Sequence, residues 1–311
     1  MIYIAIIIGI VLTGFILNEY YYHIVLRNTQ EHQILRGKKK KNLSWISFGS
    51  SYCRYGITSG KGEAGFNFGV AAQFLYYSDK MLREYSTSCL KNKGNVYLII
   101  ADLVFAEVGR GWYGAERYNE LLKKKTLGDD FSYKQRLLLR FPLLAHPRNI
   151  KRLLRYIIKG DQNQYSTLRY NELSEKEVHA QAAKRCSDWC RQFGLKDTIS
   201  NDLSDELLKK FANTRKILTD MIQYCLDNDF KPILVVTPVS KIMREHLGND
   251  FIQIVLYDNI KMSNKQNVPF MDYLEDPEFD DSSLYCNNAD FLNARGRELF
   301  TKKLLNDTLA L

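Results

Sequence analysis

The sequence contains little proline, six residues among 311, and it has no low-complexity tract and no internal repeat. These absences argue against extensive disorder. The apolar content of 45% and the charged content of 25% are ordinary for a globular protein. The chain is longer than a usual single domain, but α/β folds often reach this length as one unit.

One long apolar run opens the sequence, from 2 to 17, interrupted only by Gly9, Thr13 and Gly14. With its flanks it approaches the roughly 20 residues that a membrane-spanning helix needs. Three tyrosines follow at 20–22, as is common at a membrane interface. No A-x-A-like cleavage site follows, so the sequence predicts a retained transmembrane anchor at 1–18 rather than a cleaved signal peptide. A buried N-terminal strand or helix is the alternative.

Basic residues follow this run and do not precede it. The juxtamembrane segment at 19–42 contains Arg27, Arg36 and four consecutive lysines at 38–41. By the positive-inside rule, this distribution favours a cytoplasmic location for the rest of the chain.

Short apolar runs alternate with helical patterns across 43–311. Strands are predicted at 43–48, at 95–101 and at 231–237, and the last two runs are continuously apolar, as in strands buried on both faces. A weaker strand is predicted at 268–271. This alternation predicts an α/β fold with a parallel sheet. The helices are expected at 70–85, 205–228, 250–263 and 294–307.

A basic and mainly helical insertion at about 109–201 interrupts this rhythm. Between 110 and 159 there are 13 lysines or arginines and 4 aspartates or glutamates, an excess equal to the net charge of +9 of the whole chain. The insertion could contact an anionic lipid surface or an anionic polymer, or it could be a solvated basic face. Nucleic acid is not expected as a partner, because no recognised binding motif accompanies the charge.

Cysteine and histidine give no clear metal site. Cys186 and Cys190 are four residues apart on a predicted helix, with His179 one heptad earlier. Two thiolates and an imidazole could bind zinc, but a fourth ligand is not evident. We therefore predict neither a metal nor another cofactor.

A strand, a glycine and two serines precede a chain reversal at Gly49-Ser50-Ser51. This arrangement suits a nucleophilic serine, because glycine permits a tight turn and backbone N–H groups can face a developing oxyanion. A serine that caps a helix gives the same pattern.

Neighbouring segments give this motif a family resemblance. Residues 48–52 (FGSSY) with Gly56 resemble the first block of the SGNH/GDSL hydrolases, in the Gly-Ser-Ser form of the membrane-anchored branch that includes the lipoteichoic-acid D-alanylation protein DltD. Residues 67–78 (NFGVAAQFLYYS) look like the second block, and 292–296 (LNARG) are similar to the tail of the last block. The resemblance implies an SGNH-like, flavodoxin-like parallel sheet. It also implies a bacterial cell membrane with the domain on the extracytoplasmic side, opposite to the charge argument.

The resemblance implies roles for five positions. Ser51 matches the nucleophile, and Gly69 matches the second-block glycine whose N–H helps to form the oxyanion hole. Gly49, Ser50 and Asn293 are expected to contribute to the oxyanion hole or to substrate binding.

The remaining catalytic positions depart from the family. The last block has Asn288 and Phe291 where the family has an aspartate and a histidine base. A serine hydroxyl needs a base to accept its proton, and phenylalanine cannot do so. Asp290 beside the lost position is a candidate base, and His246 is an outsider. The third-block Gly-x-Asn-Asp is absent, but Asp102 ends a core strand, where it could bind a ligand, act in catalysis or cap a turn.

Three functions remain open. The first is an esterase or O-acyltransferase that acts on cell-envelope glycopolymers through a Ser51 acyl-enzyme. The alternative is a catalytically degenerate accessory or binding protein in envelope polysaccharide modification, whose partner could be a membrane-bound acyltransferase. The third is a basic membrane-surface adaptor unrelated to acyl chemistry.

Overall fold

The chain forms two compact units in the computed structural model. The first unit combines Met1–Arg36 with Tyr113–Thr167, and the second combines Gly37–Trp112 with Leu168–Leu311. The insertion predicted at about 109–201 is therefore divided between them. The structure describes residues 2–59, 64–100, 105, 115–160, 174–193, 203–286 and 290–311.

The first unit begins with the apolar helix α1 (Ile2–Tyr20), which continues as a π-helix, η1 (Tyr21–Val25). Together they form one helix that is long and apolar enough to cross a membrane. Its side chains are exposed from 2 to 17. The predicted N-terminal apolar helix is confirmed.

Short helices pack around the end of this long helix. Leu153 is buried against Tyr21 and Val25, and it forms with them the small hydrophobic core of the unit. The helices are α2 (Gln30–Gly37), which leads to the second unit, α5 (Tyr118–Leu121), α6 (Lys124–Leu127), η3 (Gly128–Asp130), α7 (Tyr133–Arg140), α8 (Pro142–Ala145) and α9 (Pro147–Lys159).

The second unit is built on a five-stranded parallel sheet in the order β2-β1-β3-β4-β5. The register pairs Ser47 with Tyr97 and Tyr97 with Ile233 at its centre. The predicted α/β fold with a parallel sheet is confirmed. The strands are β1 (Leu43–Phe48), β2 (Gly65–Asn67), β3 (Leu90–Ile100), β4 (Lys231–Val236) and β5 (Phe270–Asp272).

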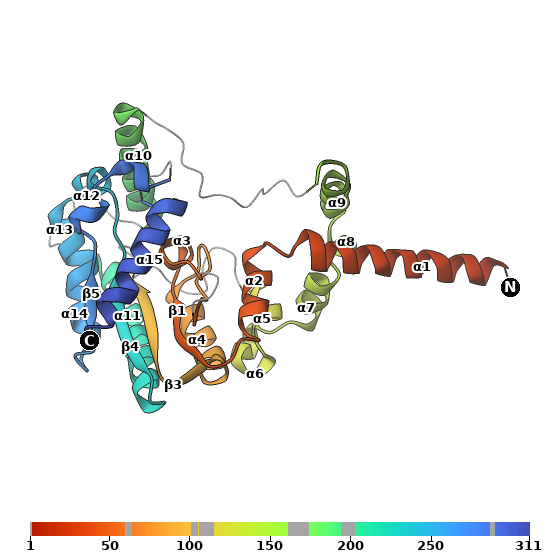
Figure 1. The fold of residues 1–311 in the computed structure, drawn as a ribbon, viewed down its shortest axis with the longest axis horizontal. Coiled ribbons are helices and arrows are strands. Elements are labelled where there is room, and N and C mark those ends of the chain that lie inside the picture. Colours follow the sequence, from red (N-terminus) through yellow and green to blue (C-terminus); the bar gives the residue numbers. More distant parts are fainter. Residues whose placement is uncertain are drawn as a thin grey trace. The chain divides into compact units, whose positions relative to one another are not determined.

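Helices cover both faces of this sheet, because side chains alternate along each strand. On one face, the Phe48 ring stacks on Phe68, which contacts Tyr85 of α4. On the other, Tyr97 donates from its hydroxyl to Thr308 Oγ1 of α15 at 3.2 Å. The first face carries α4 (Leu75–Cys89), α11 (Asp205–Asp227) and α14 (Asp258–Ser263), and the second carries α3 (Ser51–Gly56) and α15 (Ala294–Thr308) (Figure 1).

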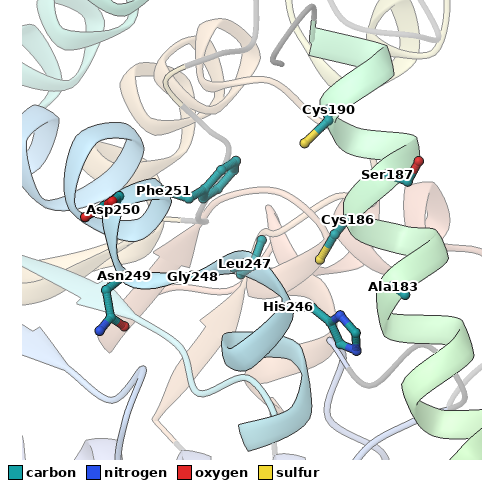
Figure 2. Close-up of a pocket in the computed structure, with 10 residues that line it drawn as sticks. All are labelled: Ala183, Cys186, Ser187, Cys190, His246, Leu247, Gly248, Asn249, Asp250 and Phe251. Carbon is teal, nitrogen blue, oxygen red and sulfur yellow. The ribbon is translucent and has the colours of Figure 1, made fainter. Parts of the chain in front are cut away.

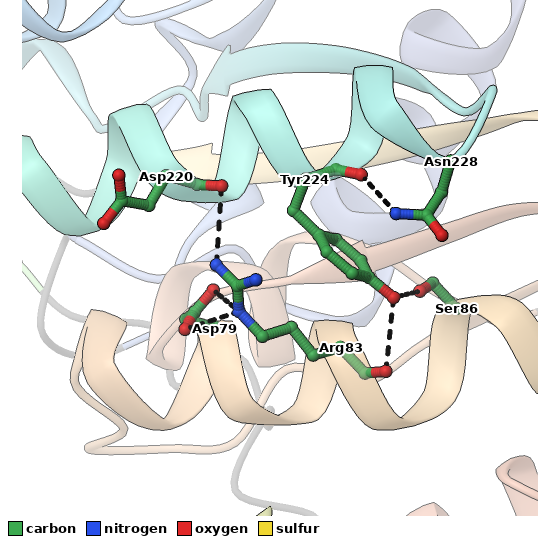
Figure 3. A network of polar contacts seen from close by, with 6 residues as sticks. All are labelled: Asp79, Arg83, Ser86, Asp220, Tyr224 and Asn228. Atoms are coloured by element: carbon green, nitrogen blue, oxygen red, sulfur yellow. Dashed lines mark hydrogen bonds and ion pairs between the residues drawn. The ribbon is translucent and has the colours of Figure 1, made fainter.

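A polar network joins α4 to α11 on the first face (Figure 3). Arg83 donates from Nε to the Asp79 carboxylate at 2.8 Å and from Nη2 to the backbone oxygen of Asp220 at 3.5 Å. The Tyr224 hydroxyl donates to the Arg83 backbone oxygen at 3.3 Å and lies 3.2 Å from Ser86 Oγ. These contacts fix the two helices that underlie the central strands.

Two predicted helices differ from those observed. The helix expected at 70–85 begins five residues later, at Leu75, because 70–74 form a turn in which Ala72 has a positive φ of 54°. The helix expected at 250–263 is instead α13 (Asn249–Phe251), a π-helix η4 (Ile252–Tyr257) and α14. The other helices of this unit are α10 (Glu175–Phe193), α12 (Lys241–Leu247), η5 (Pro277–Phe279) and η6 (Ser282–Leu284).

Candidate functional site

The turn after β1 places the predicted nucleophile at the carboxyl edge of the sheet. Gly49 has φ of +156°, and a Cβ there would lie 2.9 Å from both the Ile99 backbone oxygen and Cys53 Cβ. Only glycine fits this position without displacing the neighbouring strand. Ser50 then stands at the N-cap of α3, and Ser51 is its first residue.

Ser51 lies beside a second turn, which follows β2. The backbone N–H of Ala72 donates to Ser51 Oγ at 3.1 Å. Ala72 has a left-handed backbone conformation, which is uncommon for alanine and which aims this N–H at the serine. In open parallel sheets, ligands bind outside the carboxyl ends of the strands, and Ser51 occupies such a position.

Asn67 connects the second turn to α3. Its Nδ2 donates to the backbone oxygens of Cys53 and Ile57, both at 2.7 Å, and its Oδ1 accepts from the Gly69 N–H at 2.7 Å. The Gly69 N–H, predicted to face an oxyanion, is therefore used within the fold. A Cβ at Gly69 would lie 2.7 Å from the backbone nitrogen of Arg54, so this glycine permits a close approach of the two segments.

Cys53 lies on the inner side of α3, and its side chain is fully buried. Cys53 Sγ donates to Asn67 Oδ1 at 3.1 Å and lies 3.4 Å from Ser47 Oγ. Burial raises the pKa of this thiol to about 12. Cys53 is thus protonated at neutral pH and belongs to the packing of the site, not to its nucleophiles.

Phe291 packs directly on the helix that starts with Ser51. Its ring centroid lies 5.2 Å from that of Tyr52 and 5.3 Å from that of Tyr55, in tilted and edge-on geometries. Both tyrosines belong to α3. Position 291, where the resemblance implies a histidine, therefore belongs to an aromatic cluster. Asn288 and Asp102 lie outside the described residues.

Asp290, the candidate base, is directed to another helix. Its Oδ2 accepts from Arg185 Nε of α10 at 3.1 Å, and its Oδ1 is buried and makes no hydrogen bond within the described part of the chain. Burial raises the pKa of this carboxyl to about 6, although the Arg185 guanidinium opposes the shift. The Arg185 guanidinium also lies over the Trp189 ring and near the Phe291 ring.

Asn293 is used by the fold as the N-cap of α15. Its Oδ1 accepts from the Gly296 N–H at 3.1 Å. Its Nδ2 donates to the backbone oxygens of Ser283 at 2.6 Å and Tyr285 at 3.2 Å. This buried amide anchors the last block to α15, and its predicted role toward a substrate has no support from this arrangement.

His246, the less favoured candidate base, lines a pocket of about 450 Å³ whose lining does not include Ser51 (Figure 2). Its Nε2 lies 3.4 Å from His179 Nδ1 of α10, and the pocket is also lined by Cys186 and Cys190. Across the residues that the structure describes, no three histidine, cysteine or acidic side chains are close enough to hold a metal ion. No contact joins His246 to Ser51 among these residues either.

Two groups at this site could not be found from the sequence. Arg185 pairs with Asp290 across 105 positions of the sequence, and no local signal identifies such a partner. The Ala72 N–H reaches Ser51 only because alanine takes a conformation that favours glycine or asparagine.

No family model matches the sequence, and a search of the curated proteins finds no match. The class that the structure establishes is an α/β protein with a five-stranded parallel sheet and one N-terminal helix apolar enough to cross a membrane.

Proposed function

We propose that this chain is a membrane-anchored, SGNH-like protein that has lost its catalytic dyad and acts as an accessory or binding protein in the acyl modification of cell-envelope glycopolymers. The observation that carries this proposal is the packing of Phe291 on Tyr52 and Tyr55. An aromatic ring on the nucleophile helix cannot accept a proton from a serine hydroxyl.

The topology supports the SGNH-like part of the proposal. The strand order 2-1-3-4-5 is that of flavodoxin-like sheets, and ligands of such sheets bind at the switch point between β1 and β3. The turn at Gly49 follows β1 and contacts Ile99 of β3, so Ser51 lies close to this switch point.

A Ser51-dependent esterase or O-acyltransferase is the second candidate. One observation favours it, the Ala72 N–H that already lies 3.1 Å from Ser51 Oγ. An acyl-enzyme also needs a base, and the described part of the chain brings no imidazole or carboxylate into contact with Ser51. Without a base, only the residual rate from oxyanion stabilisation and binding is expected, on the order of 10³–10⁴ over water.

Labelling with a fluorophosphonate separates the two candidates. The chain in detergent and its Ser51→Ala variant are expected to label equally slowly, because the described residues bring no base into contact with Ser51. Ser50→Ala is the matched control, since Ser50 makes no side-chain capping bond to α3. Labelling that depends on Ser51 and not on Ser50 would refute the accessory role and support the enzyme.

Binding tests the positive half of the proposal. The full-length chain is expected to sediment with an O-acylated envelope glycopolymer, and Ser51→Tyr is expected to weaken this binding at least tenfold by filling the strand-edge position. Lys261→Tyr is the control, because Lys261 is exposed on α14, on the opposite face of the sheet. Equal binding by the two variants would show that the glycopolymer does not bind at Ser51.

A role in envelope modification requires the second unit to be extracytoplasmic, whereas the basic residues after α1 favour the cytoplasm. A reporter protein fused after Leu311 decides the side. Activity of a reporter that works only in the cytoplasm would contradict the envelope role.

A further inference from the structure

Helix α9 (Pro147–Lys159) of the first unit exposes one apolar and one cationic surface. Four apolar side chains form what we call the lipid face: Ile150, Leu154, Ile157 and Ile158, all exposed, with Ile158 at 79%. At 100° per residue these four fall within one arc of the helix. Four exposed cations on the next arc form the basic edge: Arg148, Lys151, Arg155 and Lys159.

The third arc of α9 attaches it to the end of the apolar helix. Leu153 is buried against Tyr21 and Val25. The Tyr21 hydroxyl donates to Asn149 Oδ1 at 3.1 Å, and the Tyr156 and Tyr20 rings are 6.4 Å apart, edge to face. The arc of α9 that packs against the first unit is therefore different from the lipid face.

These contacts fix the level of α9 along α1. The 19 residues of α1 make a rod of about 28 Å at 1.5 Å per residue, close to the roughly 30 Å of a bilayer hydrocarbon core. Tyr20, Tyr21 and Val25 contact α9, and they lie at the C-terminal end of this rod or just beyond it. If α1 spans the bilayer, α9 lies within the headgroup layer.

The direction of α9 agrees with this level. Figure 1 shows α1 in the plane of the picture and α9 almost end-on, so the two axes cross steeply. A helix that crosses a membrane-spanning helix steeply lies along the surface of the membrane. An apolar face beside a cationic face, with no acidic residue on the helix, is the pattern of helices that bind in the plane of anionic membranes.

We propose that α9 is an in-plane membrane helix that binds an anionic lipid leaflet, with the lipid face among the acyl chains and the basic edge among the headgroup phosphates. This second membrane contact holds the first unit at the bilayer surface. It is independent of any chemistry at Ser51.

Depth-dependent fluorescence quenching tests the proposal on the full-length chain in nanodiscs of phosphatidylcholine and phosphatidylglycerol with brominated acyl chains. Ile158→Trp places a tryptophan on the lipid face and Lys159→Trp places one on the basic edge, and the wild-type signal is subtracted. We expect bromine to quench the Ile158→Trp fluorescence at least twofold more than the Lys159→Trp fluorescence. We also expect the difference to shrink when phosphatidylglycerol is omitted.

Quenching at neither position, or stronger quenching at Lys159→Trp, would overturn the proposal. In the first case, the lipid face lies outside the acyl chains. Ile8→Trp in α1 is the control for the anchor: if it too escapes quenching, α1 is outside the bilayer, and that failure is distinct from a failure of α9. Ile157→Trp and Arg155→Trp replace the first pair if either variant unfolds.

Discussion

Arg185 Nε donates to Asp290 Oδ2 at 3.1 Å, so the residue immediately before Phe291 is tied to helix α10 and not to the Ser51 turn. Asp290 is fully buried, whereas the Arg185 side chain is 34% exposed. The carboxylate next to Phe291 therefore makes a structural contact with Arg185.

Asp290 should make stability depend on pH. The pKa of its carboxyl is raised from 3.8 to about 6 by burial, so the folded state holds the proton more tightly than the unfolded chain. The contribution is complete below about pH 4 and is lost as the pH rises through 6, on the order of 3 kcal/mol. Denaturant unfolding in detergent should show this loss in the wild type and not in Asp290→Asn.

The control is Asp188→Asn, which removes a more exposed carboxylate from α10, the helix that carries Arg185. It should keep the pH dependence of the wild type. The same slope in Asp290→Asn and the wild type would show that Asp290 does not titrate in this range.

Removing the arginine of the pair should destabilise the fold at neutral pH. In Arg185→Gln, the buried Asp290 carboxylate loses its charged donor, which costs about 1–3 kcal/mol. The same substitution in an Asp290→Asn background should cost less, because no charge remains to be paired. Equal costs in the two backgrounds, measured as a double-mutant cycle, would contradict the ion pair.

Gly69→Ala should disturb the turn beside Ser51. A Cβ at this position lies 2.7 Å from the Arg54 backbone nitrogen and from Cys53 Sγ, and a backbone atom cannot rotate away. Overpacking of this kind costs about 1–3 kcal/mol. Gly9→Ala is the control, because the Cβ that it adds meets no described atom within 4 Å apart from its chain neighbours and the adjacent backbone of its own helix. An unchanged unfolding midpoint for Gly69→Ala would show that the loop after β2 accommodates the added methyl group without strain.

Restoring the family residues should restore nucleophilicity if the SGNH resemblance is correct. Phe291→His together with Asn288→Asp supplies a base and the carboxylate that orients it. We expect fluorophosphonate labelling of Ser51 to rise at least about tenfold, since a positioned base contributes about 10²–10⁴. Ser51→Ala in the same background should abolish the increase. No gain in a folded variant would argue that position 291 is not equivalent to the family histidine.

The strands and long helices could be predicted because burial leaves a simple pattern. The apolar run at 231–237 predicted a strand covered on both faces, and β4 occupies Lys231–Val236. The helices expected at 205–228 and 294–307 are observed at Asp205–Asp227 and Ala294–Thr308. In each, one apolar face repeats with the helical period.

The details of the site could not be predicted, because they depend on tertiary contacts. Nothing local in the sequence requires a left-handed Ala72, yet this residue delays α4 and supplies the N–H beside Ser51. The structural role of Asn293 could not be predicted for a similar reason. Its place in a family motif suggested a substrate contact, whereas its three hydrogen bonds cap α15 and fix the segment before it.

The buried thiol of Cys53 can report local opening of α3, the helix that begins with Ser51. With a pKa near 12 and no exposed surface, it can be alkylated at neutral pH only when α3 lifts from the sheet. The rate at which a maleimide modifies Cys53 therefore reports how often this helix opens. Such a measurement works on the protein in intact membranes, where calorimetry and denaturant titration are difficult.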